Sequence, residues 1–188
     1  MFDKCNNKKT NNLSKKNRFK TVIITGTPGT GKTMIAKKLS KIVKFNVINV
    51  NDSIKKNKLS EGYDKKRKCI IVDVKKLNKA IIKIINNCKK NCCCSGLIIE
   101  SHLSHNLPKN YVDLCIVTKC NLKELKKRLI KRGYNAEKVR ENLDSEIFDI
   151  CLVEATEKGH KCIVMDTTTP IKVSAKLGKI ANLIKKFK

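Results

Sequence analysis

Short apolar runs alternate along the chain with longer segments in which apolar residues recur every three or four positions. The runs predict β-strands, and the longer segments predict amphipathic helices. Strands alternating with helices form a parallel sheet covered on both faces, so we expect an α/β fold with five parallel strands. The predicted strands are residues 19–25, 44–50, 96–100, 111–117 and 161–166. The predicted helices are residues 34–43, 74–88, 122–133, 136–151 and 173–184.

The stretch between the second strand and the second long helix follows neither period. Its first residues, 51–53, are Asn, Asp and Ser, which favour the start of a short helix. Residues 61–64 predict a turn, and the apolar run 69–72 leads to Asp73, a suitable cap for the next helix.

The segment after the first strand is a phosphate-binding motif. Residues 26–33 read GTPGTGKT, a complete G-x-x-x-x-G-K-[ST] pattern between a buried strand and a helix. Its backbone N–H groups would face a phosphate at the positive end of the helix. Lys32 would reach the β- and γ-phosphates, and the Thr33 hydroxyl would hold Mg²⁺. The alternative is a glycine-rich turn without a ligand. The predicted ATP-binding residues here are Gly29, Thr30, Gly31, Lys32, Thr33 and Met34.

A second candidate segment is a lid that begins at Lys131. Arg132 stands at the end of a predicted helix and opens a short loop, where it would bind ATP and clamp the transferring phosphoryl group. Arg128 lies one turn earlier on the same face and could act likewise. The alternative for both is a solvated cation that complements the helix dipole.

A third candidate is the end of the third predicted strand. Glu100 is the acidic residue expected near Mg²⁺, directly or through a water, because ligands bind beyond the carboxyl ends of such strands. His102 could position the attacking water or sense the γ-phosphate, or could be a structural histidine. His105 follows three residues later and is interpreted as part of a loop.

Charge suggests a polyanionic environment. The chain of 188 residues has 43 Lys and Arg against 16 Asp and Glu, a net charge of +27. The two explanations are an RNA partner and a general compositional bias towards lysine. With few aromatic residues, any contact to RNA would be mostly to phosphate. Residues 1–18 are rich in Asn and Lys and predict a flexible basic tail.

The ten cysteines predict free thiols, because a nucleotide-binding loop suits a reducing compartment. Those at 69, 115, 151 and 162 lie in or beside apolar runs and are expected in the core. Cys88, Cys92, Cys93 and Cys94 lack the spacing of a zinc site. The polar start and the absence of a long apolar run indicate a soluble, intracellular protein without membrane contact.

Together these motifs resemble the adenylate kinase isoenzyme 6 family, also called the coilin-interacting nuclear ATPase family. The resemblance runs from about residue 20 to the C-terminus and combines a common P-loop with more specific motifs. Its carriers are residues 25–33, residues 48–50 with Asp52, EGYD at 61–64, Glu100 with His102, RGYN at 132–135, and Asn142 with EIF at 146–148.

The resemblance implies one kinase domain over residues 19–188, with a monophosphate-binding segment at about 49–72 and a lid at about 131–141. It implies transfer from MgATP to AMP, giving two ADP, and an intrinsic ATPase. Implied partners are a small-subunit ribosomal protein and pre-rRNA during 18S rRNA maturation, with a monomer acting in nucleus and cytoplasm. The implied monophosphate-binding residues are Asn49, Asp52, Lys55, Tyr63 and Asp73.

Three departures from the family pattern are visible. Glu100 replaces the usual aspartate, and Lys55 stands near the place of an arginine that would grip the acceptor phosphate with two hydrogen bonds. The cysteine-rich stretch at 88–94 is an insertion without an assigned function. Lys55 favours an ATP-switched assembly factor over a kinase, and a kinase for another small molecule is a third alternative.

Overall fold

The computed structural model describes residues 18–56, 58–65, 67, 69–91 and 95–186. The predicted basic tail therefore lies outside the described residues except for Arg18, and so do Cys92, Cys93 and Cys94. Among the described helices, none is long and apolar enough to span a membrane.

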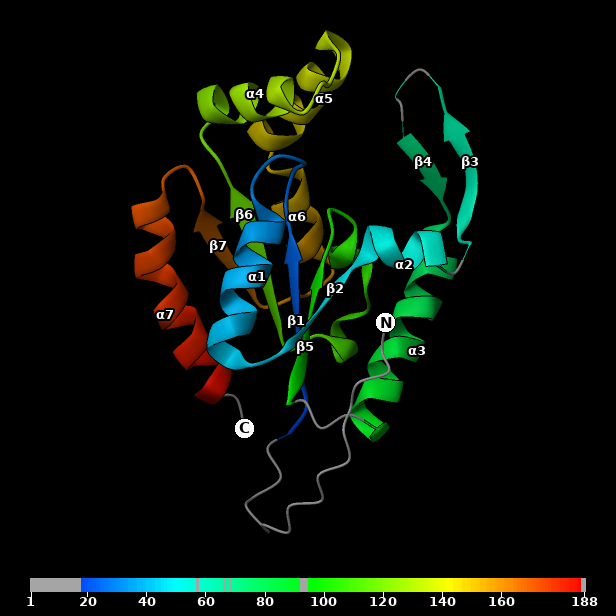
Figure 1. The fold of residues 1–188 in the computed structure, drawn as a ribbon, viewed down its shortest axis with the longest axis vertical. Coiled ribbons are helices and arrows are strands. Elements are labelled where there is room, and N and C mark those ends of the chain that lie inside the picture. The colour runs from blue at the N-terminus through cyan, green and yellow to red at the C-terminus, as the bar shows by residue number, and fades with distance from the viewer. Residues whose placement is uncertain (1–17, 57, 66, 68, 92–94, 187–188) are drawn as a thin grey trace.

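The centre of the protein is a parallel sheet of five strands in the order β2-β5-β1-β6-β7, which confirms the predicted fold class (Figure 1). Val22 in the central strand pairs with Ile98 on one side and with Leu114 on the other. All four strand pairings in this sheet are parallel, so the carboxyl ends of the five strands lie at one edge. The strands are β1 (Lys20–Thr25), β2 (Asn46–Asn49), β5 (Gly96–Glu100), β6 (Leu114–Lys119) and β7 (Cys162–Asp166).

Helices cover both faces of this sheet because successive strand residues point to opposite sides. Val22 and Ile24 pack with helices α1 and α7, whereas Ile23 packs with α3 and α6. Figure 1 shows α1 and α7 together on one side of the strands and α3 on the other flank. The helices are α1 (Lys32–Val43), α3 (Val74–Asn91), α6 (Ile150–Glu157) and α7 (Pro170–Lys186).

Two smaller units stand beyond the carboxyl ends of the strands. One is the helix pair α4 (Leu122–Lys131) and α5 (Ala136–Ile147), packed around Leu125, Leu129 and Val139. The other consists of α2 (Val50–Lys56) and an antiparallel hairpin of β3 (Ser60–Asp64) and β4 (Cys69–Val72). In Figure 1 both units rise above the sheet on the same side as the loop after β1.

The hairpin corrects the prediction for residues 61–64. These residues form strand β3 rather than a turn, because they pair with β4 across a register shift next to Gly62. Only the pairing with β4 identifies so polar a segment as a strand. Cys69, expected in the core, lies exposed in β4, whereas Cys115 and Cys151 are buried as predicted.

The helix predicted over 136–151 is also wrong, because it divides into α5 and α6. Asp149 adopts a left-handed conformation with φ of 53°, and this breaks the helix. Ile147 and Ile150, expected to point inward, are exposed at the corner. The strand predicted over 111–117 starts only at Leu114, after a short 3₁₀ turn, Lys109–Tyr111.

Candidate functional site

The loop between β1 and α1 has the tight path that its glycines predict. Gly26 and Gly29 have φ of 133° and 95°, values that side chains with a Cβ rarely adopt. A Cβ at Gly26 would lie 2.4 Å from the carbonyl oxygen of Thr118, and one at Gly29 would lie 2.8 Å from Leu125 Cδ1. The loop is therefore packed closely against β6 and α4.

Lys32 is held inside this loop. Its ammonium donates hydrogen bonds to the carbonyl oxygens of Gly26, at 2.7 Å, and Thr27, at 3.0 Å. Desolvation lowers the pKa of Lys32 to about 8, an effect that the negative charge of Glu100 partly opposes. An anion in the loop would offer this desolvated ammonium a stronger partner than two neutral carbonyls.

Glu100 lies at the mouth of the loop, at the carboxyl end of β5. The hydroxyl of Thr33 donates to its carboxylate at 3.0 and 3.1 Å, and the side-chain amide of Asn49 donates to the same group. Hydroxyl and carboxylate oxygens are the ligands that Mg²⁺ prefers, and Mg²⁺ takes few of them because it keeps waters and substrate phosphates. Thr33 and Glu100 thus fit the predicted metal site.

His102 stands two residues beyond Glu100 and is exposed. Desolvation by nearby protein atoms, with the positive charge of Lys32, lowers the pKa of His102 to about 4. The imidazole is therefore neutral near pH 7, where it can orient a water but cannot add positive charge.

His105, expected in a loop, is instead buried in the short 3₁₀ helix Ser104–Asn106. Its Nδ1 lies 2.7 Å from the hydroxyl of Thr25, the last residue of β1, and its Nε2 lies 2.6 Å from a carboxylate oxygen of Glu154. Desolvation lowers the pKa of His105 although Glu154 acts in the opposite direction. The residue braces the end of β1 against α6.

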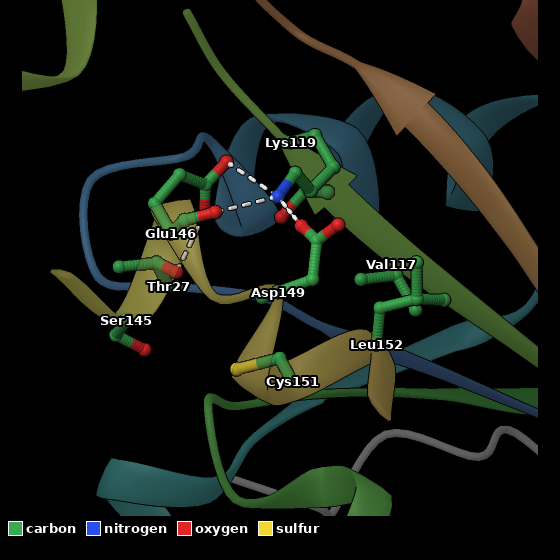
Figure 2. A pocket seen from close by; sticks show the side chains of 10 residues that line it. Thr27, Val117, Lys119, Ser145, Glu146, Asp149, Cys151 and Leu152 are labelled. Atoms are coloured by element: carbon green, nitrogen blue, oxygen red, sulfur yellow. Dashed lines mark hydrogen bonds and ion pairs between the residues drawn. The ribbon is translucent and has the colours of Figure 1, made fainter. Parts of the chain in front are cut away.

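Glu146 is a functional candidate whose contact with the loop the sequence did not predict. It is only 4% exposed, and its carboxylate accepts hydrogen bonds from the hydroxyl of Thr27, at 2.6 Å, and the backbone N–H of Cys120, at 2.8 Å. Figure 2 shows the ammonium of Lys119 between Glu146 and Asp149, with Thr27 on the other side of the Glu146 carboxylate. This network joins the P-loop to the corner between α5 and α6.

The two lid arginines differ in their surroundings. Arg132 caps α4, is exposed, and lies near enough to Lys32 for its charge to contribute to the lowered pKa of that lysine. Arg128 is not a solvated helix-end cation, because its guanidinium donates to the carbonyl oxygens of Thr167 and Thr168. Thr167 in turn donates to the carbonyl oxygen of Thr30 at 2.6 Å. Arg128 therefore ties α4 to the loop after β7, which touches the P-loop.

Two of the predicted monophosphate-binding residues cap helices, and the other three are exposed. Asn49 accepts from the N–H of Asn51 and so caps α2, and Asp73 caps α3 in the same way through the N–H of Lys75. The backbone N–H groups of Lys76 and Lys75 both donate to the carboxylate of Asp73, and these two hydrogen bonds, that of Lys76 first, lower its pKa. The other three residues, Asp52, Lys55 and Tyr63, are exposed.

A contact between the hairpin and the lid was missed by the sequence prediction. Arg67, at the turn of the hairpin, forms an ion pair with Glu141 of α5, with 3.2 Å between Nε and Oε1. Lys138 of the same helix donates to the backbone carbonyl of Arg67 at 2.8 Å. The turn of the hairpin and helix α5 thus touch each other.

Comparisons with known proteins agree with this geometry. A family model described as an AAA domain matches residues 22–149. A putative adenylate kinase of Methanosarcina acetivorans is 39% identical over 145 residues, which cover 77% of this chain and 76% of that one. An adenylate kinase isoenzyme 6 homolog of Schizosaccharomyces pombe is 34% identical over 77% of this chain and 79% of its own. The chain belongs to the adenylate kinase isoenzyme 6 family.

A solved structure shows that the fold of this chain is also found in a kinase. The crystal structure of a shikimate kinase from Bacteroides thetaiotaomicron superposes with a TM-score of 0.59, covering 88% of this chain and 98% of that one. Its sequence is only 10% identical, so the likeness shows the fold alone. The sequence relatives support a kinase-type enzyme that uses a nucleotide.

Proposed function

We propose that the protein transfers the γ-phosphoryl group of ATP to AMP or a related nucleoside monophosphate, and that it also hydrolyses ATP. The observation that carries this proposal is that Lys32 and Thr33 lie close to Glu100 in a tightly packed P-loop. In the transfer, an oxygen of the acceptor phosphate forms a bond to the γ-phosphorus, and the bond to the β-phosphate oxygen breaks, which leaves ADP. The acceptor phosphate is already anionic, so the reaction needs positioning and charge more than a strong base.

Each residue of the site has a part in this proposal. Lys32 would pair with the β- and γ-phosphates, and Arg132 would approach from the lid to neutralise the equatorial oxygens. Thr33 and Glu100 would hold Mg²⁺, which supplies charge neutralisation across the phosphates. In the absence of a monophosphate, the neutral imidazole of His102 would orient a water for hydrolysis.

A steady-state assay of ADP formation tests the proposal. We expect addition of AMP to raise the rate far above the AMP-free rate, with two ADP formed for each ATP and AMP consumed. A rate that does not respond to AMP or to any other nucleoside monophosphate would overturn the kinase assignment.

A second candidate function is an ATP-driven assembly factor for the small ribosomal subunit. Two observations favour it: the net charge of +27, and the exposed Lys55 where a bidentate arginine would suit a kinase. In this role ATP would shift the hairpin and the lid between states with different affinity for a ribosomal protein and pre-rRNA. This role is supported if the rate of ATP hydrolysis does not respond to AMP but changes when a small-subunit ribosomal protein is added.

A further inference from the structure

Exposed apolar side chains gather at the corner between α5 and α6, in a segment that the proposed function does not use. Four of the seven residues 147–153 are large, apolar and exposed, and Phe148 is 68% exposed. Scattered apolar residues are normal on a protein surface, whereas a contiguous group of them marks a contact site. We call these four residues the corner patch: Ile147, Phe148, Ile150 and Val153.

The two helices that meet at this corner are acidic in a basic protein. Residues 136–157 have seven Asp and Glu against two Lys and Arg, whereas the whole chain has 16 against 43. Arg67 and Lys119 pair with Glu141 and Asp149, and the surplus at α5 and α6 is still negative. A basic segment, which the rest of this surface repels, is therefore attracted to the corner patch.

Helix α6 leads from the corner patch to the first described residue of the chain (Figure 1). The loop that follows α6 contains Gly159, which lines the same hollow as Arg18 at the amino end of the sheet. Ile150, Val153 and Glu157 are exposed and recur every three or four positions, so one face of α6 is open along its length. Because α6 has eight residues, this face is about 12 Å long.

The sequence that precedes Arg18 has the chemistry that this face requires. Residues 13–17 read LSKKN, so two lysines stand near Arg18 and a leucine stands beyond them. Five extended residues span up to about 17 Å, which is more than the length of α6. The lysines can therefore reach Glu157 at the near end of the helix, and the leucine can reach the corner patch at the far end. The asparagine beside Arg18 is a residue type that favours the reversal of direction that this path needs.

We propose that residues 13–17 of this chain dock on the corner patch and on the exposed face of α6. The leucine covers apolar side chains beside Phe148, and the two lysines lie beside the acidic residues of α6. The same corner holds Glu146, whose carboxylate accepts a hydrogen bond from Thr27 of the P-loop. The docked segment therefore lies next to the brace of the nucleotide site, although its binding does not depend on which reaction that site performs.

The first experiment compares backbone amide NMR signals of full-length proteins. The triple variant Leu13→Ser with Lys15→Gln and Lys16→Gln removes the docking side chains. We expect the signals of the corner patch to shift relative to wild type while those of α3 stay in place. The control is Lys4→Gln with Lys8→Gln, which removes two charges further from Arg18 and should leave the corner patch unchanged. Identical corner signals in wild type and the triple variant would overturn the proposal.

A charge swap then tests the pairing with α6. Lys15→Glu with Lys16→Glu should move the Phe148 signal to its position in the triple variant, because the reversed charges are repelled by Glu157. Adding Glu157→Lys to this double variant should move the signal back towards wild type. Phe148 is the readout because it stands nine positions before residue 157. A failure of Glu157→Lys to restore the signal would show that the lysines act through general charge, and would overturn the docking on α6.

The same spectra separate the proposed occupant from a second copy of the chain. An intramolecular contact gives a Phe148 signal that does not depend on protein concentration. A synthetic peptide of residues 9–17, added at millimolar concentration to the triple variant, should move that signal towards wild type; the affinity is weak because the peptide lacks the effective concentration of the attached segment. A Phe148 signal that moves with protein concentration, together with a dimer in sedimentation analysis, would assign the corner patch to a second copy and overturn the proposal.

Discussion

The two sides of the nucleotide site are built in different ways. On the ATP side, the P-loop is packed so tightly that Gly26 and Gly29 have no room for a methyl group, and Glu100 is buried among donors. On the acceptor side, two apolar side chains of the hairpin are exposed: Tyr63 at 58% and Ile71 at 50%. The first side is closely packed, whereas the second leaves apolar side chains exposed.

This difference predicts that changes on the ATP side are severe and changes on the acceptor side are mild. The largest effect is expected for Lys32→Ala. Loss of the ammonium that pairs with the β- and γ-phosphates should lower kcat of phosphoryl transfer and of hydrolysis about 100-fold or more. The control is Lys38→Ala, an exposed lysine of the same helix, which should match wild type. Unchanged turnover in the Lys32 variant would rule out the P-loop assignment.

The second largest effect is expected for Glu146→Ala. The change leaves the Thr27 hydroxyl and the Cys120 N–H without their acceptor in a buried place, so the free energy of unfolding should fall by about 2–4 kcal/mol. Thermal unfolding measures this loss, and calorimetry should show weaker MgATP binding because the loop loses its brace. Asp144→Ala, at an exposed position of the same helix, should change stability by less than about 0.5 kcal/mol. Equal effects of the two variants would show that the contacts of Glu146 with Thr27 and Cys120 do not stabilise the loop.

The same contrast decides what the sequence could predict. The P-loop is one continuous motif, so its ligand and its place beside Glu100 could be predicted from local residues and strand order. The brace from Glu146 could not, because it joins residues 119 positions apart. Glu146 lies next to the corner between α5 and α6. That corner depends on Asp149, whose left-handed backbone is stabilised by Lys119 at the end of β6. No local pattern shows that partner.

The acceptor side was harder to predict for a related reason. Residues 61–64 are polar, and only pairing with β4 makes them a strand. Arg67 meets Glu141 through tertiary contact alone. A signal that could have found some of the missing residues is their position at strand ends: Lys119 ends β6, and Thr167 follows β7 directly.

A third prediction concerns His102, which lies between the two sides. His102→Gly should lower kcat of hydrolysis about tenfold while ATP affinity stays near that of wild type, because the neutral ring orients water rather than binding phosphate. Since the pKa of His102 is about 4, wild-type hydrolysis should show no histidine step between pH 6 and 8. If kcat and KM of the variant both equal those of wild type, His102 is a structural residue.

A fourth prediction uses the pKa of Lys32. In the free protein this pKa is lowered to about 8, and a bound triphosphate favours the ammonium and raises it. MgATP affinity should therefore be full below about pH 8 and should fall as pH rises above it. At pH 8.5 binding should take up about 0.8 proton, against about 0.1 at pH 7.

Calorimetry in two buffers of different ionisation enthalpy measures this proton uptake. Lys32→Arg is the control, because a guanidinium stays charged throughout this range. Uptake that persists in the arginine variant would assign the proton to another group.

The smallest effect is expected on the acceptor side, for Arg67→Gln. The ion pair with Glu141 is exposed and should contribute no more than about 1 kcal/mol, so the KM for AMP should rise about two- to fivefold at low salt. Glu141→Gln should have the same effect, and the double variant should add little, because both changes remove one contact. The matched control is Arg140→Gln, which breaks an exposed pair with Asp144 within α5 and leaves the hairpin untouched. An equal rise in KM for this control would show that the charge of the helix, rather than its contact with the hairpin, governs the acceptor side.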